Sequence, residues 1–187
     1  MPARHLKKNR RQQCVVVGAG ENSAINSPDR RRLIATLDYK TILIRAVGGG
    51  LGIALMVTLA HASGQPLMTV PFATSIVLVM GSPDAAPARP HVVVGGHFLS
   101  AFAGVVCTAI LGDALWASAV GVSLAVALMQ ATDTFHPPAG ISPLIITSAH
   151  ATPLFLLSPV FAGALLLVAF AFAYHRLAGE RWPEHWT

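Results

Sequence analysis

Hydrophobic residues run along most of this chain in stretches far longer than the elements of a water-soluble domain. Asp, Glu, Lys and Arg do not occur in residues 46–83, 90–112, 114–132 or 134–175. A helix that crosses the hydrocarbon core of a bilayer needs about 20 predominantly apolar residues. The pattern therefore predicts an all-α integral membrane protein whose first partner is the lipid bilayer.

Four of these apolar stretches are long enough to cross the bilayer as helices. They cover about residues 41–60, 92–111, 114–131 and 154–174. Small residues recur four positions apart within them, as at Gly48 and Gly52, and this spacing lets membrane helices approach closely. We expect four full transmembrane helices.

Two further apolar stretches, 71–81 and 137–149, begin with proline and are too short to cross alone. Eleven to thirteen residues at 1.5 Å each span less than ~20 Å of a ~30 Å core. An offset of 67 residues superposes them, with Pro71 on Pro138, Ala73 on Gly140 and Ser75 on Ser142. This match predicts two short half-helices and a two-fold internal repeat, with halves at about 41–111 and 114–175.

A half-helix that begins inside the membrane presents unpaired backbone N–H groups and partial positive charge at its start. A small anion can bind there without any lysine, and proline suits the first helical turn because it has no N–H. Short, proline-interrupted segments at matching positions of two halves are typical of a transporter's binding site. The candidate pathway residues are His136, Pro137, Pro138, Ala139, Gly140, Ser142, Pro71, Ala73, Thr74, Ser75, His97 and Gly96.

Each polar candidate also has a purely structural interpretation. His136 either contacts or gates the anion, because imidazole titrates near neutrality, or hydrogen-bonds a loop carbonyl. His97 either lines the pathway or is a core histidine with its own partner. Asp133 either orients His136 or is a solvated acid. Hydroxyl groups either donate to the anion or bond back to a preceding carbonyl, and Arg45 either snorkels to the interface or serves as a counter-charge.

The charged residues lie mostly before the first span. Ten of the 13 Lys and Arg fall between Arg4 and Arg45, and the net charge is +5. The positive-inside rule explains this cluster better than nucleic-acid binding does, so no nucleic-acid partner is expected. Residues 1–40 are expected to be a basic cytoplasmic segment, 41–176 the transmembrane domain and 177–187 a short cytoplasmic tail. Two cysteines offer neither a disulfide framework nor metal-ligand spacing, and no metal or cofactor is expected.

Two topologies are compatible with these segments. In the favoured one the chain passes six times, both termini and the 82–90 turn lie on the cytoplasmic side, and the two halves are inverted. In the other, four crossings and two re-entrant segments leave both half-helix tips on one side.

Several ordered motifs carry a family resemblance: PFATSIVLV, GSPDAAPARP, VVVGGHFLSA, FHPPAGIS and a last span that ends in YHRL. Over about residues 40–186 the chain resembles the HPP family of integral membrane proteins. The resemblance implies four membrane helices and, for some members, nitrite transport, while others carry CBS regulatory domains. This chain departs from the family pattern at Thr74, His91 and Ile141, which bears on the identity of the anion.

The leading hypothesis is a transporter or channel for a small inorganic anion, nitrite by resemblance, in a bacterial inner membrane. So small a chain is expected to act as a homo-oligomer. The alternative is a membrane-embedded regulatory or interaction subunit without transport activity. A membrane enzyme with His136 and Asp133 as acid and base is disfavoured, because the sequence places no nucleophile, metal set or third partner beside them. Converging half-helix tips would favour transport, and tips that lie apart would favour the subunit.

Overall fold

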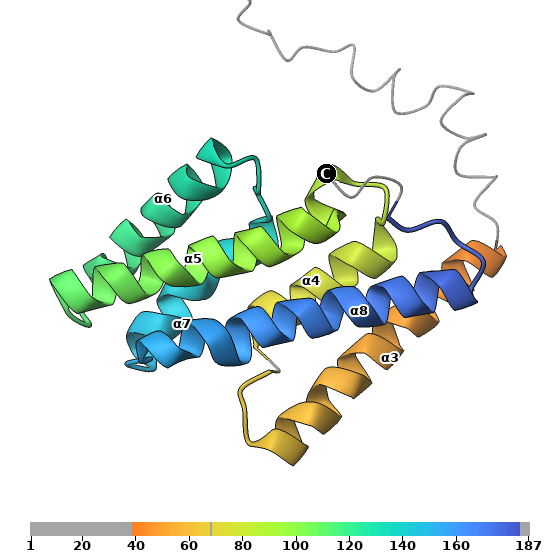
Figure 1. The fold of residues 1–187 in the computed structure, drawn as a ribbon, viewed down its shortest axis with the longest axis horizontal. Helices are drawn as coiled ribbons and strands as arrows, with labels where there is room; N and C mark the ends of the chain where they lie inside the picture. Colours follow the sequence, from red (N-terminus) through yellow and green to blue (C-terminus); the bar gives the residue numbers. More distant parts are fainter. Residues whose placement is uncertain (1–38, 68, 184–187) are drawn as a thin grey trace, which may run out of the picture. The chain divides into compact units, whose positions relative to one another are not determined.

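The computed structural model describes residues 39–67 and 69–183, and the regular elements among these residues are all helical (Figure 1). This confirms the all-α prediction for the described part of the chain. The prediction of a basic cytoplasmic segment over residues 1–40 lies almost entirely outside it.

The longer helices are α3 (Tyr39–Ser63), α4 (Val70–Gly81), α5 (Pro90–Leu111), α6 (Leu115–Ala131) and α8 (Ala162–Leu177). Short helical turns connect them: η1 (Ala86–Ala88), η2 (Pro137–Ile141), α7 (Ser142–Ser148), η3 (Pro153–Leu156) and η4 (Leu157–Phe161). The two predicted half-helices thus appear as α4 and as η2 followed by α7. Each has proline within its first two positions. A backbone N–H at these positions makes no intrahelical hydrogen bond, so proline loses nothing there.

Within the described residues, three helical segments are long and apolar enough to cross a membrane, namely Tyr39–Ser63, Pro90–Leu111 and Pro153–Leu177. The expected fourth span is α6, whose 17 residues extend about 26 Å against a core of ~30 Å, so four full spans are not confirmed. The last span begins irregularly: Ser158 has φ −139° and ψ 121° inside a wide turn that precedes α8, next to Pro159, which has no N–H to donate.

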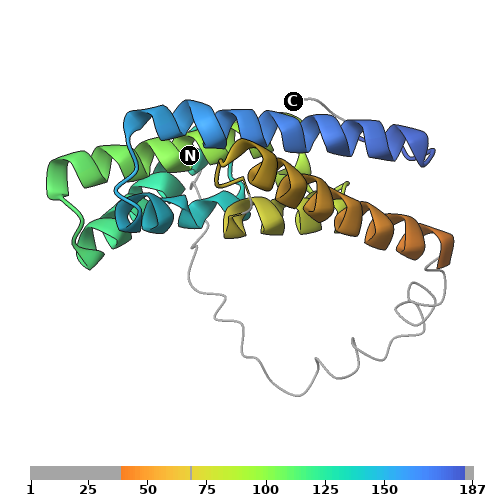
Figure 2. The ribbon, with the colours of Figure 1, turned by 90° about the horizontal axis from the view of Figure 1, so that it is seen from below.

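The beginning of α3, the turn after α4 and the end of α8 meet at one end of the helix assembly (Figures 1 and 2). There the Tyr174 hydroxyl donates to the Ile44 carbonyl at 2.6 Å, and Arg45 lies 3.8 Å from Asp84. At the other end, Asp113 after α5 lies 3.6 Å from His150 after α7. Consequently α4 runs toward the first end and α7 away from it, as the inverted arrangement requires, while the internal repeat itself stays a prediction.

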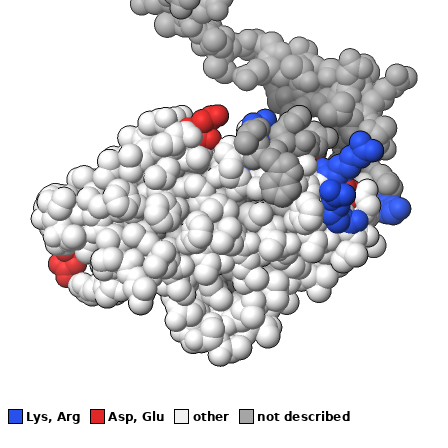
Figure 3. All heavy atoms as spheres, viewed as in Figure 1, with Lys and Arg blue, Asp and Glu red and all other residues white. Residues whose placement is uncertain are grey.

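Glycines set the closest approaches between these helices. A Cβ at Gly48 would lie 2.5 Å from the Tyr174 ring, and a Cβ at Gly104 or Gly121 would lie 2.9 Å from Pro143 of α7. The small-residue spacing therefore serves helix packing. On the face shown in Figure 3, charged side chains lie at the margins and the broad surface between them carries none, as a lipid-facing belt requires.

Candidate functional site

Ser75, in the second turn of α4, is the centre of a buried polar cluster. Its Oγ lies 2.9 Å from Nε2 of His97 on α5 and 2.7 Å from Nε2 of His136, the residue before η2. It also lies 2.7 Å from the carbonyl oxygen of Pro71. Ser75 and His136 are 0% exposed and His97 is 1% exposed. Two histidines from distant parts of the chain thus contact the same serine hydroxyl inside the protein.

The position of His136 is fixed from two further sides. Its Nδ1 lies 2.8 Å from the carbonyl oxygen of Pro87 in η1, and since a carbonyl only accepts, Nδ1 carries a hydrogen. On the opposite side, a Cβ at Gly96 would lie 2.5 Å from the His136 Cβ. A side chain at position 96 would therefore displace the imidazole.

His97 is held by an aromatic contact as well as by Ser75. Its ring stacks on Phe72 of α4 with centroids 4.7 Å apart, and its centroid is 5.2 Å from that of His136. One turn further along α5, the Ser100 hydroxyl donates to the Ala139 carbonyl at 2.6 Å. Ser100 thereby ties η2 to α5 and helps to hold the segment that follows His136.

A small cavity lies beside this cluster, where the first turns of α4 and α7 approach each other. Its volume is about 10 Å³, which is room for roughly one water molecule. The lining residues are Thr69, Pro71, Phe72, His97, Ser142, Ile145, Phe155 and Val160. Thr69 precedes α4 and makes no side-chain cap, and Pro71 in the first turn has no N–H to donate.

The structure brings together only part of the predicted set. Around the cluster and cavity lie Pro71, Ser75, Gly96, His97, His136, Ala139 and Ser142. The remaining candidates lie elsewhere: Thr74, Pro137 and Pro138 line a separate, open surface groove, Ala73 is half-buried, and Gly140 faces Met129 of α6. The Thr74 hydroxyl bonds back to the Val70 carbonyl at 2.8 Å, the structural alternative for such residues.

Asp133 does not orient His136. The hydrogen bonds described for His136 go to Ser75 and Pro87, while Asp133 is exposed and has a positive φ of 53°. Sequence reasoning missed Pro87 because a backbone carbonyl leaves no residue-type signal. The only trace of it is the proline-rich 82–90 turn among the family motifs.

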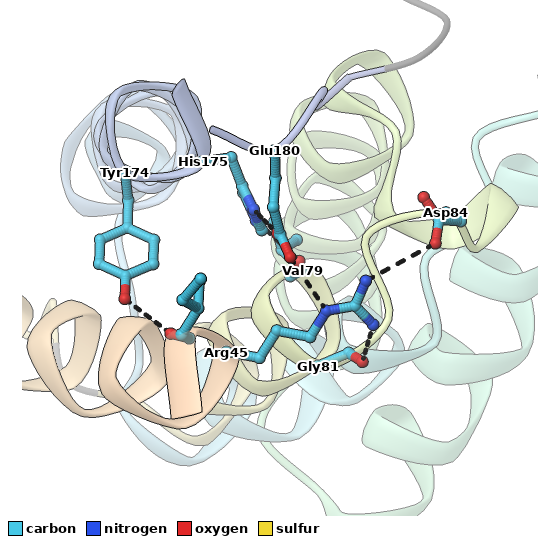
Figure 4. A network of polar contacts seen from close by, with 8 residues as sticks. Arg45, Val79, Gly81, Asp84, Tyr174, His175 and Glu180 are labelled. Atoms are coloured by element: carbon cyan, nitrogen blue, oxygen red, sulfur yellow. Dashed lines mark hydrogen bonds and ion pairs between the residues drawn. The ribbon is translucent and has the colours of Figure 1, made fainter. Parts of the chain in front are cut away.

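Arg45 of α3 belongs to a second polar network (Figure 4). This network lies at the Gly81 end of α4, whereas the cavity lies at the Pro71 end. The Arg45 guanidinium lies 3.6 Å from Glu180, 3.8 Å from Asp84 and 3.3 Å from the Gly81 carbonyl. Glu180 also lies 2.7 Å from Nδ1 of the fully buried His175. Two carboxylates therefore balance the Arg45 charge, and Arg45 is not the counter-charge of the cavity.

Within residues 39–67 and 69–183, no three His, Cys, Asp or Glu side chains lie close enough together to hold a metal ion. The residues of the cluster and cavity supply imidazole rings, hydroxyl groups and backbone dipoles.

Comparison with known proteins matches a family described as "HPP, transmembrane region" over residues 34–183. A transmembrane protein of Dictyostelium discoideum is 34% identical over 124 residues, which cover 62% of this chain and 44% of that protein. A second transmembrane protein of the same organism is 33% identical over 124 residues, which cover 62% and 40%. The chain thus spans less than half the length of these relatives, and no solved structure matches it. With apolar membrane-length helices and a family match over most of its length, this chain is an integral membrane protein that belongs to the HPP transmembrane family.

Proposed function

We propose that this chain is a transporter or channel for a small inorganic anion, with nitrite as the expected substrate. The observation that carries the proposal is the meeting of the two half-helix segments at Ser75 and His136, 2.7 Å apart, beside the cavity. A regulatory subunit would not need two half-helices to converge on a buried polar cluster.

The cavity offers an anion several kinds of favourable contact. The first-turn N–H groups and the dipole of the 12-residue helix α4 supply partial positive charge. The Ser142 hydroxyl lines the same space and can donate a hydrogen bond. Lys, Arg, Asp and Glu are not among the lining residues, so no fixed charge would hold the anion too tightly to be released.

The cavity in the described conformation is smaller than the proposed anion. A space of about 10 Å³ admits roughly one water molecule, and nitrite has three heavy atoms. Passage therefore requires the lining to move, and Phe155 and Val160 belong to the irregular segment before α8. This segment is the part of the lining with the fewest regular helical bonds, so it is the expected moving part.

We place the protein in a bacterial inner membrane with both termini on the cytoplasmic side, in keeping with the basic residues before the first span. A homo-oligomer is the expected assembly. In the described part of the chain, the polar cluster lies inside a single copy, so each copy would carry its own pathway.

The test is nitrite uptake by proteoliposomes that contain the purified full chain, with chloride and nitrate as competitors. Protein-free vesicles at each pH are essential, because undissociated nitrous acid crosses lipid unaided. The informative variant is His136→Ala, and the matched control is His61→Ala, an exposed histidine in the last turn of α3.

We expect saturable uptake above the protein-free control in wild type and His61→Ala, and its loss in His136→Ala. Uptake no faster than in empty vesicles for all three anions would refute transport and favour the regulatory subunit. Full uptake by well-folded His136→Ala would show that the pathway lies elsewhere.

A further inference from the structure

The hydrogen-bond inventory around Ser75 permits two protonation states without any movement of heavy atoms. A serine hydroxyl has one hydrogen to donate and two lone pairs that accept. Three groups surround its Oγ at 2.7–2.9 Å: Nε2 of His136, Nε2 of His97 and the carbonyl oxygen of Pro71. The carbonyl can only accept, and each imidazole nitrogen can accept or donate.

In the neutral state, the hydrogen on Nδ1 of His136 is donated to the Pro87 carbonyl, so its Nε2 has a free lone pair. The Ser75 hydroxyl then donates to His136, and His97 donates its Nε2 hydrogen to Ser75. The Pro71 carbonyl receives no hydrogen from Ser75 in this state.

In the protonated state, one added proton resides on Nε2 of His136, which now donates to Ser75. The serine hydroxyl rotates and donates to the Pro71 carbonyl, which already lies 2.7 Å away. Ser75 accepts from both histidines and donates once, which uses its full hydrogen-bonding capacity. One bond to hydrogen has formed, none has been lost, and the cluster carries one positive charge.

Among the described residues, no Lys or Arg lines the cavity and could balance an anion there. Helices α4, α6 and α7 contain no titratable side chain, and the titratable group that α5 directs at the cluster is His97. Asp84 and Arg89 flank η1 and neither lines the cavity. Asp84 forms an ion pair with Arg45, and Asp133 is exposed. Balancing charge at the cavity therefore has to come from a proton on the two histidines.

We propose that the cluster of Ser75, His97 and His136 binds one proton with each anion that enters the cavity, so that transport is electroneutral co-transport of H⁺ and anion. This inference rests on the proposed transport function. The physical reason is reciprocal: an isolated charge in a low-dielectric site is strongly disfavoured, and an opposite charge beside it offsets much of that cost. Proton and anion thus favour each other's entry, and each disfavours crossing alone.

The experiment measures nitrite uptake by wild-type proteoliposomes under an imposed membrane potential, together with proton entry reported by a trapped pH dye. A tenfold potassium gradient with valinomycin sets about 59 mV. All rates are initial rates above those of protein-free vesicles, so that leakage of nitrous acid is removed. We expect an unchanged uptake rate at either sign of the potential and one proton entering per nitrite.

Uptake that accelerates when the interior is positive, without proton entry, would overturn co-transport while leaving anion transport intact. Uptake equal to that of protein-free vesicles would instead overturn the proposed function itself. The two failures are therefore distinguishable in one series of measurements on the unaltered protein.

Two variants test the assignment to this cluster. In His136→Gln the amide keeps a donor and an acceptor but binds no proton, and in Ser75→Ala the link between the histidines is lost. We expect both to lose proton-coupled uptake, with His61→Ala retaining it. Electroneutral uptake at the wild-type rate in His136→Gln would overturn the assignment.

Discussion

Substitution of Gly96 by alanine is the most direct test of how closely α5 approaches the segment that contains His136. The new Cβ would lie 2.5 Å from the His136 Cβ and 2.9 Å from the carbonyl oxygen of Thr134. Ordinary van der Waals contact begins at 3.4 Å, so His136 must retreat by roughly 1 Å. Such a shift would stretch its 2.7 Å contact with Ser75 beyond hydrogen-bonding distance.

The expected effect on stability is the difference of two opposing terms. Replacing a glycine inside a helix by alanine ordinarily stabilises it by about 0.5–1 kcal/mol, whereas overpacking a close contact costs about 1–3 kcal/mol. Gly49→Ala is the matched control, because a Cβ at position 49 meets nothing within 4 Å. We therefore expect Gly49→Ala to be neutral or stabilised and Gly96→Ala to fall below it by about 1–3 kcal/mol.

The assay is reversible unfolding of both variants and wild type in the same detergent, followed by tryptophan fluorescence, with nitrite uptake measured in parallel. The control removes the helix-propensity term, so the gap between the two variants reports the close contact alone. If Gly96→Ala were as stable as Gly49→Ala and transported at the wild-type rate, the argument that glycine is needed to seat His136 would be wrong.

Three further predictions concern the rest of the bundle. Glu180→Ala should destabilise the protein by about 1–3 kcal/mol, because buried His175 loses its hydrogen-bond partner at 2.7 Å. Asp84→Ala, at a 69% exposed side chain, should cost about 0–1 kcal/mol; equal losses in the same melts would contradict the burial argument. Ser100→Ala should cost about 0.5–1.5 kcal/mol, because the Ala139 carbonyl of η2 loses its 2.6 Å donor but keeps the N–H of Ser142, and an unchanged unfolding midpoint would count against that role. Single cysteines at positions 84 and 113, in a protein with its native cysteines replaced, should react with an impermeant thiol reagent from opposite sides of the membrane; labelling from one side would rule out the inverted topology.

Most of the helix positions could be predicted, because the length of an uncharged segment and the position of a proline affect the backbone locally. A run without Asp, Glu, Lys or Arg long enough to span a bilayer indicates a membrane helix whatever packs beside it. Pro71 and Pro138 likewise mark the starts of the half-helices from their own chemistry. The helix α6 agrees with the predicted stretch 114–131 to within one residue, but its 17 residues are fewer than the roughly 20 that a full crossing needs.

The sequence indicated which residue types form the candidate site but not which of them contact one another. His97, His136 and Ser75 stood out because polar groups among apolar residues are costly unless they find partners. Nothing in their spacing showed that the two imidazoles share one hydroxyl, since 22 and 61 residues separate them from Ser75. The same limitation explains why Asp133 was weighed as a partner of His136 when the Pro87 carbonyl fills that role.

The membrane character, the helical class and the positions of the two half-helices follow from the sequence alone, because each of these depends on residues close together in the chain. Which polar groups meet depends on the tertiary fold. It placed Ser75 between two histidines, and it paired Arg45 with Glu180, which lies beyond the last helix. The physical reason is that a buried polar side chain needs a hydrogen-bond partner. The hydropathy of the sequence shows which polar groups are buried but not which groups they contact. The close packing at Gly48, Gly96 and Gly104 brings distant segments of the chain together.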